Sequence, residues 1–250
     1  MQTKRPQSPA VALVTDAASP VGRAIALALA QQGWDLALHY QDDAAPAALL
    51  ALVQECTALG RQAITIQCPL SDETQVNALL PSVIAALGSV SCVVNNASHV
   101  EHDSAPGFSA AGLERHMRAN LAAPILLAQA LHAATLKTGG AQAVVINLLD
   151  QKLFNPQPDF LSYTLSKAAL HSATTLLAQA LAPQVRVVGI APALDLGAMQ
   201  PQTPSTLDDI AATVCFIASS TAVTGSTLLV DGGQHLLPPA AIRSSSLTAD

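Results

Sequence analysis

The chain has 250 residues and 50% of them are hydrophobic, which is enough to bury a sizeable core. A formal net charge of −6 and scattered basic residues exclude a basic face for phosphate backbones, so no nucleic-acid partner is expected. Polar or charged residues interrupt the apolar stretches before they could span a bilayer, and no secretory leader precedes the first strand-like run. We therefore expect a cytoplasmic protein without a membrane partner.

Apolar runs of strand length recur along the chain, with helix-length segments between them. They cover residues 10–15, 34–40, 62–68, 90–96, 141–149, 184–190 and 226–233. Continuous Val, Ile and Leu are typical of strands that are buried on both faces. The intervening segments carry an Ala- and Leu-rich periodicity of helical type. This alternation predicts an α/β fold with a doubly wound parallel sheet of about seven strands and helices on both faces.

Local signals mark several of the expected helix ends. Gly33 and Gly60 lie where helices should stop, each followed by a strand. The run Ser71-Asp72-Glu73 resembles a helix start. These signals agree with the strand positions and support the alternation of strands and helices.

One folded domain is expected over residues 10–237, because no shift in composition divides this part of the chain. Residues 1–9 and 238–250 lack any packing pattern and are expected to be flexible. The segment 192–206 is rich in Pro, Gln and Thr and is expected to form a mobile loop over the site.

No metal site is expected. The four cysteines are widely separated and lack the paired spacings of zinc or iron–sulfur sites: Cys56, Cys68, Cys92 and Cys215. Buried, reduced thiols are the expected state. The run from His99 to Asp103 contains histidine and acidic residues, but it lacks the i, i+4 histidine pair of a metal-binding helix.

The sequence SYTLSKAAL places Tyr163 and Lys167 one turn apart on one helix face. A phenol with a pKa of about 10 is a poor proton donor or acceptor at neutral pH. A nearby ammonium favours the phenolate, so we expect Lys167 to lower the pKa of Tyr163 and to tune it as a general acid/base. The alternative is that Tyr163 and Lys167 are merely neighbours on the protein surface. The predicted helix follows the fifth strand, however, where the carboxyl ends of strands form the ligand crevice of an open sheet.

The order of motifs between about residues 10 and 237 is similar to that of short-chain dehydrogenase/reductases. The first strand and turn, VALVTDAASPVGRAIA, resemble the cofactor loop of that family, and Asn95-Asn96-Ala97 ends the fourth strand. Asn120 lies in the following helix, and Tyr163 and Lys167 occupy the catalytic positions. GIAPALDL resembles the segment that meets the nicotinamide, and VDGG resembles the end of the last strand.

This resemblance implies a Rossmann-type sheet with the strand order 3-2-1-4-5-6-7 and an NAD(P)-dependent oxidoreductase. Such an enzyme transfers a hydride between nicotinamide and a carbonyl or C=N group of a small substrate, with Tyr163 as general acid/base. The resemblance also implies that Lys167 binds the nicotinamide ribose and that Asn120 links Lys167 through water to solvent. A homotetramer, or a dimer, is implied through helices at about residues 106–138 and 160–182.

The resemblance implies NADP as the cofactor, with NAD as the alternative. Gly22 is the residue that would let the first helix and the first strand pack closely. The residues that the resemblance places against the cofactor are Thr15, Ala17, Ser19, Val21, Gly22, His39, Tyr40, Asn96, Ala97, Ser98, Lys167 and Pro192.

A closer resemblance, to pteridine reductases, rests on Asp150 and on the segments NNAS and NPQPDFLSYTLSKAAL. Asp150 stands where the wider family has Ser, and in that subgroup the Asp and the Tyr act together. A carboxyl group can pass a proton toward a ring nitrogen, whereas a Ser hydroxyl mainly orients a carbonyl oxygen. The alternative role for Asp150 is to cap nearby backbone. Val100 argues against a pteridine, because it stands where the subgroup has the aromatic residue that stacks on the substrate.

The glycine-rich turn departs from the family pattern at Asp16 and Pro20 and keeps only Gly22. A carboxylate about 4 Å from a cofactor phosphate would cost about 4 kcal/mol at an effective dielectric of about 20. That cost would weaken a micromolar affinity to about millimolar. The alternative function is therefore a catalytically degenerate family member that acts as a binding or interaction module with impaired dinucleotide binding.

Charge after the second strand bears on the choice between NADP and NAD. Gln41, Asp42 and Asp43 stand where pteridine reductases offer basic or hydroxyl residues to a 2′-phosphate. Two carboxylates there would repel that phosphate, whereas an acidic side chain can accept a hydrogen bond from a free 2′-hydroxyl. The resemblance to the family thus favours NADP, whereas the local charge favours NAD.

Overall fold

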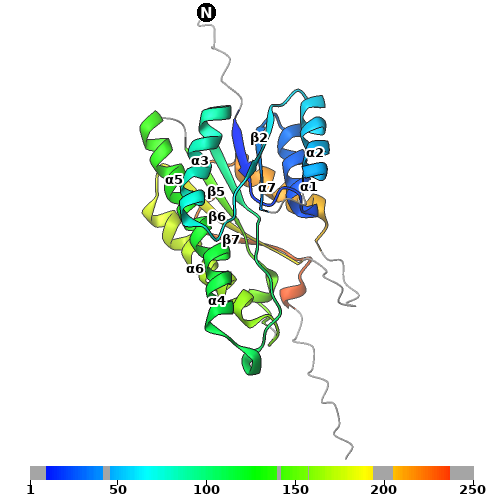
Figure 1. The fold of residues 1–250 in the computed structure, drawn as a ribbon, viewed down its shortest axis with the longest axis vertical. Coiled ribbons are helices and arrows are strands. Elements are labelled where there is room, and N and C mark those ends of the chain that lie inside the picture. The colour runs from blue at the N-terminus through cyan, green and yellow to red at the C-terminus, as the bar shows by residue number, and fades with distance from the viewer. Residues whose placement is uncertain (1–9, 42–45, 140–141, 157, 194–204, 237–250) are drawn as a thin grey trace, which may run out of the picture.

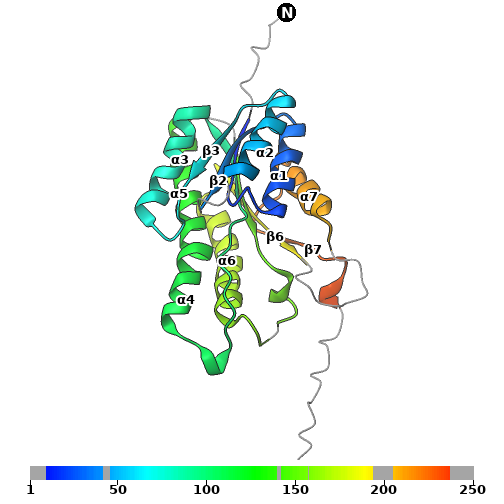
Figure 2. The same ribbon diagram turned by 45° about the vertical axis from the view of Figure 1, so that its right-hand side comes forward.

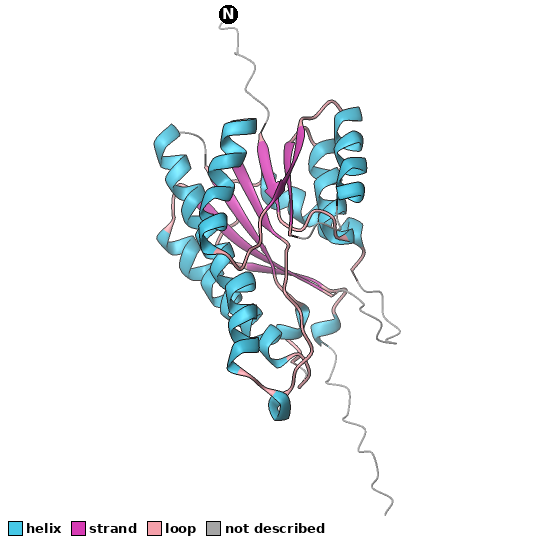
Figure 3. Cartoon of the chain, in the orientation of Figure 1, coloured by secondary structure: helices cyan, strands magenta, loops and turns pink. Residues whose placement is uncertain are grey.

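The computed structural model describes residues 10–41, 46–139, 142–156, 158–193 and 205–236. It contains one parallel sheet with the strand order β3-β2-β1-β4-β5-β6-β7 (Figures 1 and 3). The expected α/β fold and its strand order are therefore confirmed. The ends that we expect to be flexible, residues 1–9 and 238–250, lie outside the described residues, as does most of the expected loop over 192–206.

The elements follow one another along the chain as the alternation predicts. The strands are β1 Val11–Val14, β2 Asp35–Tyr40, β3 Ala63–Gln67, β4 Val90–Asn95, β5 Ala143–Leu148, β6 Val185–Pro192 and β7 Thr227–Val230. The α-helices are α1 Pro20–Gln31, α2 Pro46–Ala58, α3 Glu73–Leu87, α4 Ala110–Met117, α5 Ala123–Thr138, α6 Leu161–Ala180 and α7 Leu207–Ser219. Shorter helical turns are η1 Ala105–Gly107, η2 Arg118–Ala122, η3 Gln151–Leu153 and η4 Gln234–Leu236, of which η2 is π-helical.

The core lies on both faces of the sheet. Successive residues of a strand point in opposite directions, so Ala12 and Val14 of β1 join the core under α1, α2 and α7, whereas Val11 and Leu13 join the core under α3, α5 and α6. All four side chains are buried. Figures 1 and 2 show the two groups of helices flanking the sheet. Burial on both faces explains why the strands form continuous apolar runs in the sequence.

The expected helix ends are confirmed. α1 and α2 each end two residues before a glycine, Gly33 and Gly60, whose φ angles of 93° and 76° lie in the region that favours glycine. Asp72 caps α3, because its carboxylate accepts hydrogen bonds from two backbone N–H groups of the first turn at 2.9 and 3.2 Å.

One helical run is long and apolar. α4, η2 and α5 form the continuous run Ala110–Thr138, whose length and mean hydropathy of 1.3 would suffice to cross a membrane. A helix in the core of a folded protein can have the same length and composition. Leu127 and Leu131 are 1% and 0% exposed and belong to the core on one face of the sheet. Protein rather than lipid thus covers this face of the run.

Candidate active site

The candidate site lies where the strands end. All six strand pairs are parallel, so the carboxyl ends of the strands meet at one edge of the sheet. Thr15 directly follows β1, Asn96 follows β4, and Asp150 lies two residues after β5. Pro192 is the last residue of β6. Residues that are far apart in the sequence are thereby brought to one edge.

The turn between β1 and α1 accommodates both Asp16 and Pro20. Asp16 has a left-handed φ of 51°, a region that Asp tolerates better than most residues other than glycine. Its backbone N–H donates to Nδ1 of His39 at 3.1 Å. Pro20 is the first residue of α1, a position where its missing N–H breaks no helical hydrogen bond. Both departures from the family pattern are therefore compatible with the backbone of the turn.

Gly22 leaves no room for a side chain. A Cβ at this position would lie 2.2 Å from the backbone oxygen of Asp16 and 2.9 Å from Nδ2 of Asn96. Ser19 caps α1, since its hydroxyl accepts from the Gly22 N–H at 3.1 Å and donates to the Asp16 oxygen at 2.8 Å. The first turn of α1 carries no acidic side chain. The positive end of the helix dipole is therefore available to an anion.

His39 connects β2 to this turn and is fully buried. Its Nδ1 accepts from the Asp16 N–H, which makes Nε2 the donor to the Cys68 oxygen at 2.7 Å. Burial lowers the pKa of His39 to about 4, so the ring is neutral at neutral pH. Both ring nitrogens are thus engaged by backbone, and the side chain expected against the cofactor holds the turn in place.

Thr15 and Asn96 join the first turn to the end of β4. Oγ1 of Thr15 accepts from the backbone N–H groups of Asn96 and Ala97, both at 2.9 Å. Nδ2 of Asn96 donates to the backbone oxygens of Thr15 and Asp16, both at 3.0 Å. These side chains therefore shape the edge of the sheet by holding two loops together.

Tyr163 and Lys167 of α6 are 8% and 2% exposed. The Tyr163 hydroxyl donates to Oδ2 of Asp150 at 3.0 Å. Nζ of Lys167 lies 5.8 Å from the centroid of the Tyr163 ring and donates to the backbone oxygen of Leu148 at 2.7 Å. Oδ1 of Asp150 accepts from the backbone N–H of Lys152 at 2.8 Å. Asp150 therefore caps backbone and holds the phenol at the same time.

The expectation that Lys167 lowers the pKa of Tyr163 is wrong for this structure. Burial, reinforced by the Asp150 carboxylate that accepts its hydrogen bond, raises the pKa of Tyr163 well above the usual value. Burial also lowers the pKa of Lys167 to about 8. Loss of water disfavours the phenolate more than an ammonium at this distance favours it. Tyr163 is therefore a protonated phenol, suited to donating a proton.

Asn120 lies in the π-helical turn η2 between α4 and α5, a type of insertion that frequently occurs at functional sites. Its Oδ1 accepts from the His99 N–H at 2.7 Å, and its Nδ2 donates to the His99 oxygen and to Oγ of Ser166, both at 2.9 Å. Ser166 in turn donates to the backbone oxygen of Tyr163 at 2.7 Å. Within the described chain, Asn120 thus reaches α6 through Ser166 and has no direct hydrogen bond to Lys167.

Comparison with known proteins shows which family the chain belongs to. A family model described as short chain dehydrogenase matches residues 10–208. The chain belongs to the short-chain dehydrogenase family. Membership confirms the expected family and, with it, an NAD(P)-dependent oxidoreductase.

Several short-chain dehydrogenase relatives are similar over most of their length. Pteridine reductase 1 from Leishmania tarentolae is 29% identical over 287 residues, covering 94% of this chain and 99% of that protein. L-rhamnose 1-dehydrogenase (NAD(P)(+)) from Sphingomonas sp. (strain SKA58) is 28% identical over 246 residues, covering 90% and 95%. The crystal structure of FolM alternative dihydrofolate reductase 1 from Brucella suis in complex with NADP aligns with a TM-score of 0.84 and 31% identity, covering 93% of this chain and 98% of that one.

The remaining residues expected against the cofactor lie in the loops, at the strand ends and in the first turn of α1: Ala17, Val21, Tyr40, Ala97, Ser98 and Pro192. Ala17, Ala97 and Pro192 are buried, whereas Val21, Tyr40 and Ser98 are partly exposed. Asp42 and Asp43, which bear on the choice of cofactor, lie outside the described residues.

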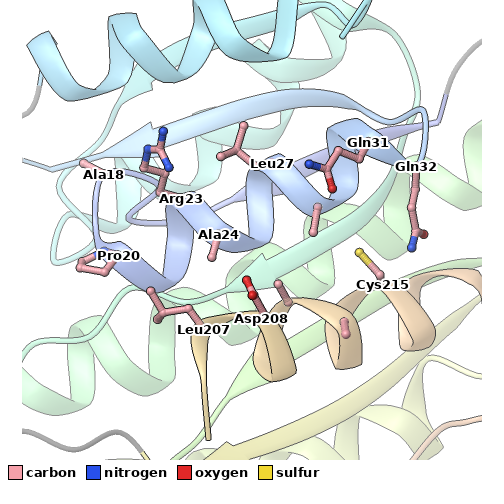
Figure 4. Close-up of a pocket in the computed structure, with 13 residues that line it drawn as sticks. Ala18, Pro20, Arg23, Ala24, Leu27, Gln31, Gln32, Leu207, Asp208 and Cys215 are labelled. Carbon is pink, nitrogen blue, oxygen red and sulfur yellow. The ribbon is translucent and has the colours of Figure 1, made fainter.

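Two surface grooves are lined by neither Tyr163 nor Lys167, although Pro20 of the first turn lines one of them. One of about 770 Å³ runs between α1 and α7, where Figure 4 shows Ala24 of α1 lying opposite Asp208 of α7. The other, of about 860 Å³, is lined by residues of α7, β7 and η4. Neither groove is lined by Tyr163.

Asn147 and Thr174, which the sequence analysis did not single out, connect Asn95 at the end of β4 to α6 in this short-chain dehydrogenase. Nδ2 of Asn95 donates to Oδ1 of Asn147 at 2.8 Å, and Nδ2 of Asn147 donates to Oγ1 of Thr174 at 3.0 Å. This chain of hydrogen bonds fixes α6 to β4 and β5. An Asn in an otherwise apolar strand could have indicated these contacts, because a buried amide needs hydrogen-bond partners.

Proposed function

We propose that the chain is an NADP-dependent reductase of a small molecule, in which Tyr163 gives a proton to the substrate. The hydrogen bond from the Tyr163 hydroxyl to Asp150 carries this proposal, together with the Lys167 ammonium 5.8 Å from the phenol ring. These groups lie at the carboxyl edge of the sheet, where ligands bind in open α/β folds.

Tyr163 acts as the general acid. Because burial and Asp150 raise its pKa, Tyr163 keeps its proton at neutral pH until the substrate takes it. The proton passes to the oxygen or nitrogen of the reduced bond as the neighbouring carbon gains a hydride. The Lys167 ammonium then offsets the charge of the phenolate. Asp150, on the other side of the phenol, relays a proton from solvent back to Tyr163.

The substrate carries a carbonyl or C=N group. A carboxyl group beside the general acid favours a C=N bond, because it can pass a proton toward a ring nitrogen. The Leishmania tarentolae and Brucella suis relatives are named as pteridine and dihydrofolate reductases, which supports a pteridine-like ring. Val100 is 47% exposed and offers no aromatic face for stacking. A carbonyl compound is therefore the second candidate.

The described residues fit a dinucleotide at this edge. The first turn of α1 lacks an acidic side chain and can hold a phosphate. Lys167 uses one of its N–H donors on the Leu148 oxygen, which leaves donors for ribose hydroxyls. NADPH, the reduced form of this cofactor, would supply the hydride when bound. The NADP complex of the Brucella suis relative supports NADP over NAD.

We also propose that the chain forms a homotetramer or a dimer through α5 and α6. Leu136 of α5 is 54% exposed, and Leu165 and Leu176 of α6 are 45% and 64% exposed. A second copy would remove this apolar surface from water. Light scattering on the purified protein should give a multiple of the monomer mass, and a monomer would contradict this proposal.

Titration with NADPH and with NADH, followed by nicotinamide fluorescence, tests cofactor binding. We expect NADPH to bind at micromolar and NADH at higher concentrations. If neither binds at millimolar concentration, the alternative is favoured, in which the chain is a binding or interaction module with an impaired dinucleotide site.

Turnover is tested by NADPH consumption with dihydrofolate, dihydrobiopterin and diacetyl as probes. Tyr163→Phe should reduce turnover about 10²- to 10⁴-fold because it removes the proton donor. Its folding and NADPH binding should be unchanged. Thr164→Ala, at the next position of α6, is the matched control and should keep its turnover. Retained turnover in Tyr163→Phe would remove Tyr163 from the mechanism.

A further inference from the structure

The helix that carries Tyr163 and Lys167 begins without a capping side chain of its own. Its N-cap residue, Phe160, has a left-handed φ of 59° and makes no side-chain capping hydrogen bond. The first N–H groups of a helix have no acceptor within the helix and need one from elsewhere. The start of α6 therefore depends on another part of the chain.

Asp103, in the loop between β4 and η1, supplies these acceptors from 59 residues away. Its carboxylate accepts from the backbone N–H of Ser162 at 3.0 and 3.3 Å and from the Ser162 hydroxyl. Its backbone oxygen accepts from the N–H groups of Phe160 at 2.8 Å and Leu161 at 3.3 Å. The side chain and backbone of Asp103 thus accept from three successive backbone N–H groups at the start of α6.

Charge and packing add to this contact. The hydrogen bond from the Ser162 hydroxyl is the largest cause that lowers the pKa of Asp103, and a negative charge at a helix N-terminus is favourable. The ring of His102 packs edge-on against Phe160, with centroids 5.2 Å apart. Nζ of Lys152 lies 5.1 Å from the same Phe160 ring. The loop, the start of α6 and η3 therefore form one packed unit.

The same loop is attached to Asn120 at its other end. The backbone of His99 exchanges two hydrogen bonds with the Asn120 side chain, which also donates to Ser166. Ser162 and Ser166 directly precede the two catalytic residues of α6. The segment from His99 to Asp103 is thus linked to α6 at two points, directly at Ser162 and through Asn120 at Ser166.

We propose that Asp103 is a positioning residue, which fixes the first turn of α6 through Ser162 and so sets where the Tyr163 hydroxyl lies relative to Asp150. The expected effect on catalysis rests on the proposed function, whereas the expected effect on the position of the Tyr163 hydroxyl does not. Without Asp103, the first turn loses its acceptors and the phenol moves away from the carboxylate. A displacement of about 1 Å can reduce a reaction rate about 100-fold.

The position of the phenol can be observed without any substrate. The chain has 2 tyrosines, so carbon-13 labelling at the tyrosine Cζ gives two signals, which Tyr40→Phe assigns. In Asp103→Ala, the Tyr163 signal should shift and its pKa should fall toward that of an ordinary phenol, because Asp150 no longer faces it. Asp72→Ala removes the cap of α3 instead. This matched control should leave the Tyr163 signal unchanged.

The second readout is kinetic, with NADPH and dihydrofolate or diacetyl as probes. Asp103→Ala should reduce kcat about 10- to 100-fold with a smaller change in the KM for NADPH. Asp103→Asn keeps an acceptor for the Ser162 N–H and should recover most of the loss. Ser162→Ala removes only the hydroxyl bond and should shift the Tyr163 signal less, which provides a milder variant if Asp103→Ala does not fold.

Three results would overturn the proposal. The first is an unchanged Tyr163 titration in Asp103→Ala. If Asp103→Ala does not fold, the second is an unchanged Tyr163 titration in Ser162→Ala. The third is a change of the Tyr163 signal in Asp72→Ala as large as that in Asp103→Ala. Failure of the proposed function is a separate outcome, recognised by retained turnover in Tyr163→Phe. In that case the Tyr163 titration still decides whether Asp103 positions the phenol.

Discussion

The Tyr163 hydroxyl donates to Asp150 Oδ2 at 3.0 Å, across the junction between the end of β5 and the start of α6. This pair joins a residue that follows a strand to a residue on the next helix. Burial and the facing carboxylate together raise the pKa of the phenol. In the proposed function, the pair favours proton donation by Tyr163, which corresponds to reduction of the substrate.

Replacing Asp150 by Asn should lower the pKa of Tyr163, because it removes the negative charge that faces the phenol while burial is kept. An ultraviolet titration of phenol ionisation in both proteins measures this change, and Tyr163→Phe identifies which part of the signal belongs to Tyr163. A pKa that rises, or that does not change, in Asp150→Asn would show that the carboxylate does not influence the phenol.

Asp150→Ser should separate the two candidate substrate classes. A Ser hydroxyl can orient a carbonyl oxygen but does not relay a proton to a ring nitrogen as a carboxyl group does. We therefore expect turnover of dihydrofolate to fall about 10- to 100-fold more than turnover of diacetyl. Steady-state kinetics with both probes gives the comparison, and an equal loss with both would argue against a proton relay through Asp150.

The rate of reduction should fall as pH rises through the pKa of Lys167. Burial lowers this pKa to about 8, and only the protonated ammonium offsets the charge of the phenolate. The pH profile of kcat/KM should therefore decrease above about pH 8 with the loss of one proton. Lys167→Arg stays charged at this pH and should show no decrease there, although at a lower rate. A wild-type profile without this decrease would contradict the assigned role of Lys167.

Gly22→Ala should destabilise the fold and weaken NADPH binding. The new Cβ would lie 2.2 Å from the Asp16 backbone oxygen, and overpacking of this kind costs about 1–3 kcal/mol. Chemical denaturation measures the free energy of unfolding, and fluorescence titration measures NADPH affinity. Gly107→Ala is the matched control, because a Cβ there meets nothing within 4 Å. Equal stability of the two variants would mean that the turn relaxes without cost.

Stability should decrease at mildly acidic pH because of His39. Its pKa is about 4 in the folded chain, against an ordinary value of 6.5, so the unfolded chain binds the proton first as pH falls. The contribution is fully present above about pH 6.5 and is lost as pH falls toward 4. This shift corresponds to about 3 kcal/mol. Denaturation of wild type and His39→Gln across this range should show a shallower decrease in the variant, and parallel curves would exclude His39.

Local spacing in the sequence was sufficient to predict the fold class and part of the site. Continuous apolar runs predicted the strands, because a strand covered on both faces needs apolar side chains in both directions. Gly33, Gly60 and Asp72 marked helix ends through preferences that act within one turn. The spacing of Tyr163 and Lys167 placed both on one face of α6 for the same local reason.

Tertiary structure alone decided the electrostatics and the long-range partners. The pKa of Tyr163 rises because the surrounding packing removes water, a quantity that no residue spacing contains. His39 and Asp103 make their contacts with segments 23 and 59 residues away, and nothing near either residue indicates the partner. Burial and pairing depend on which surfaces meet when the sheet is assembled, whereas helix and strand periodicity depend on neighbours along the chain.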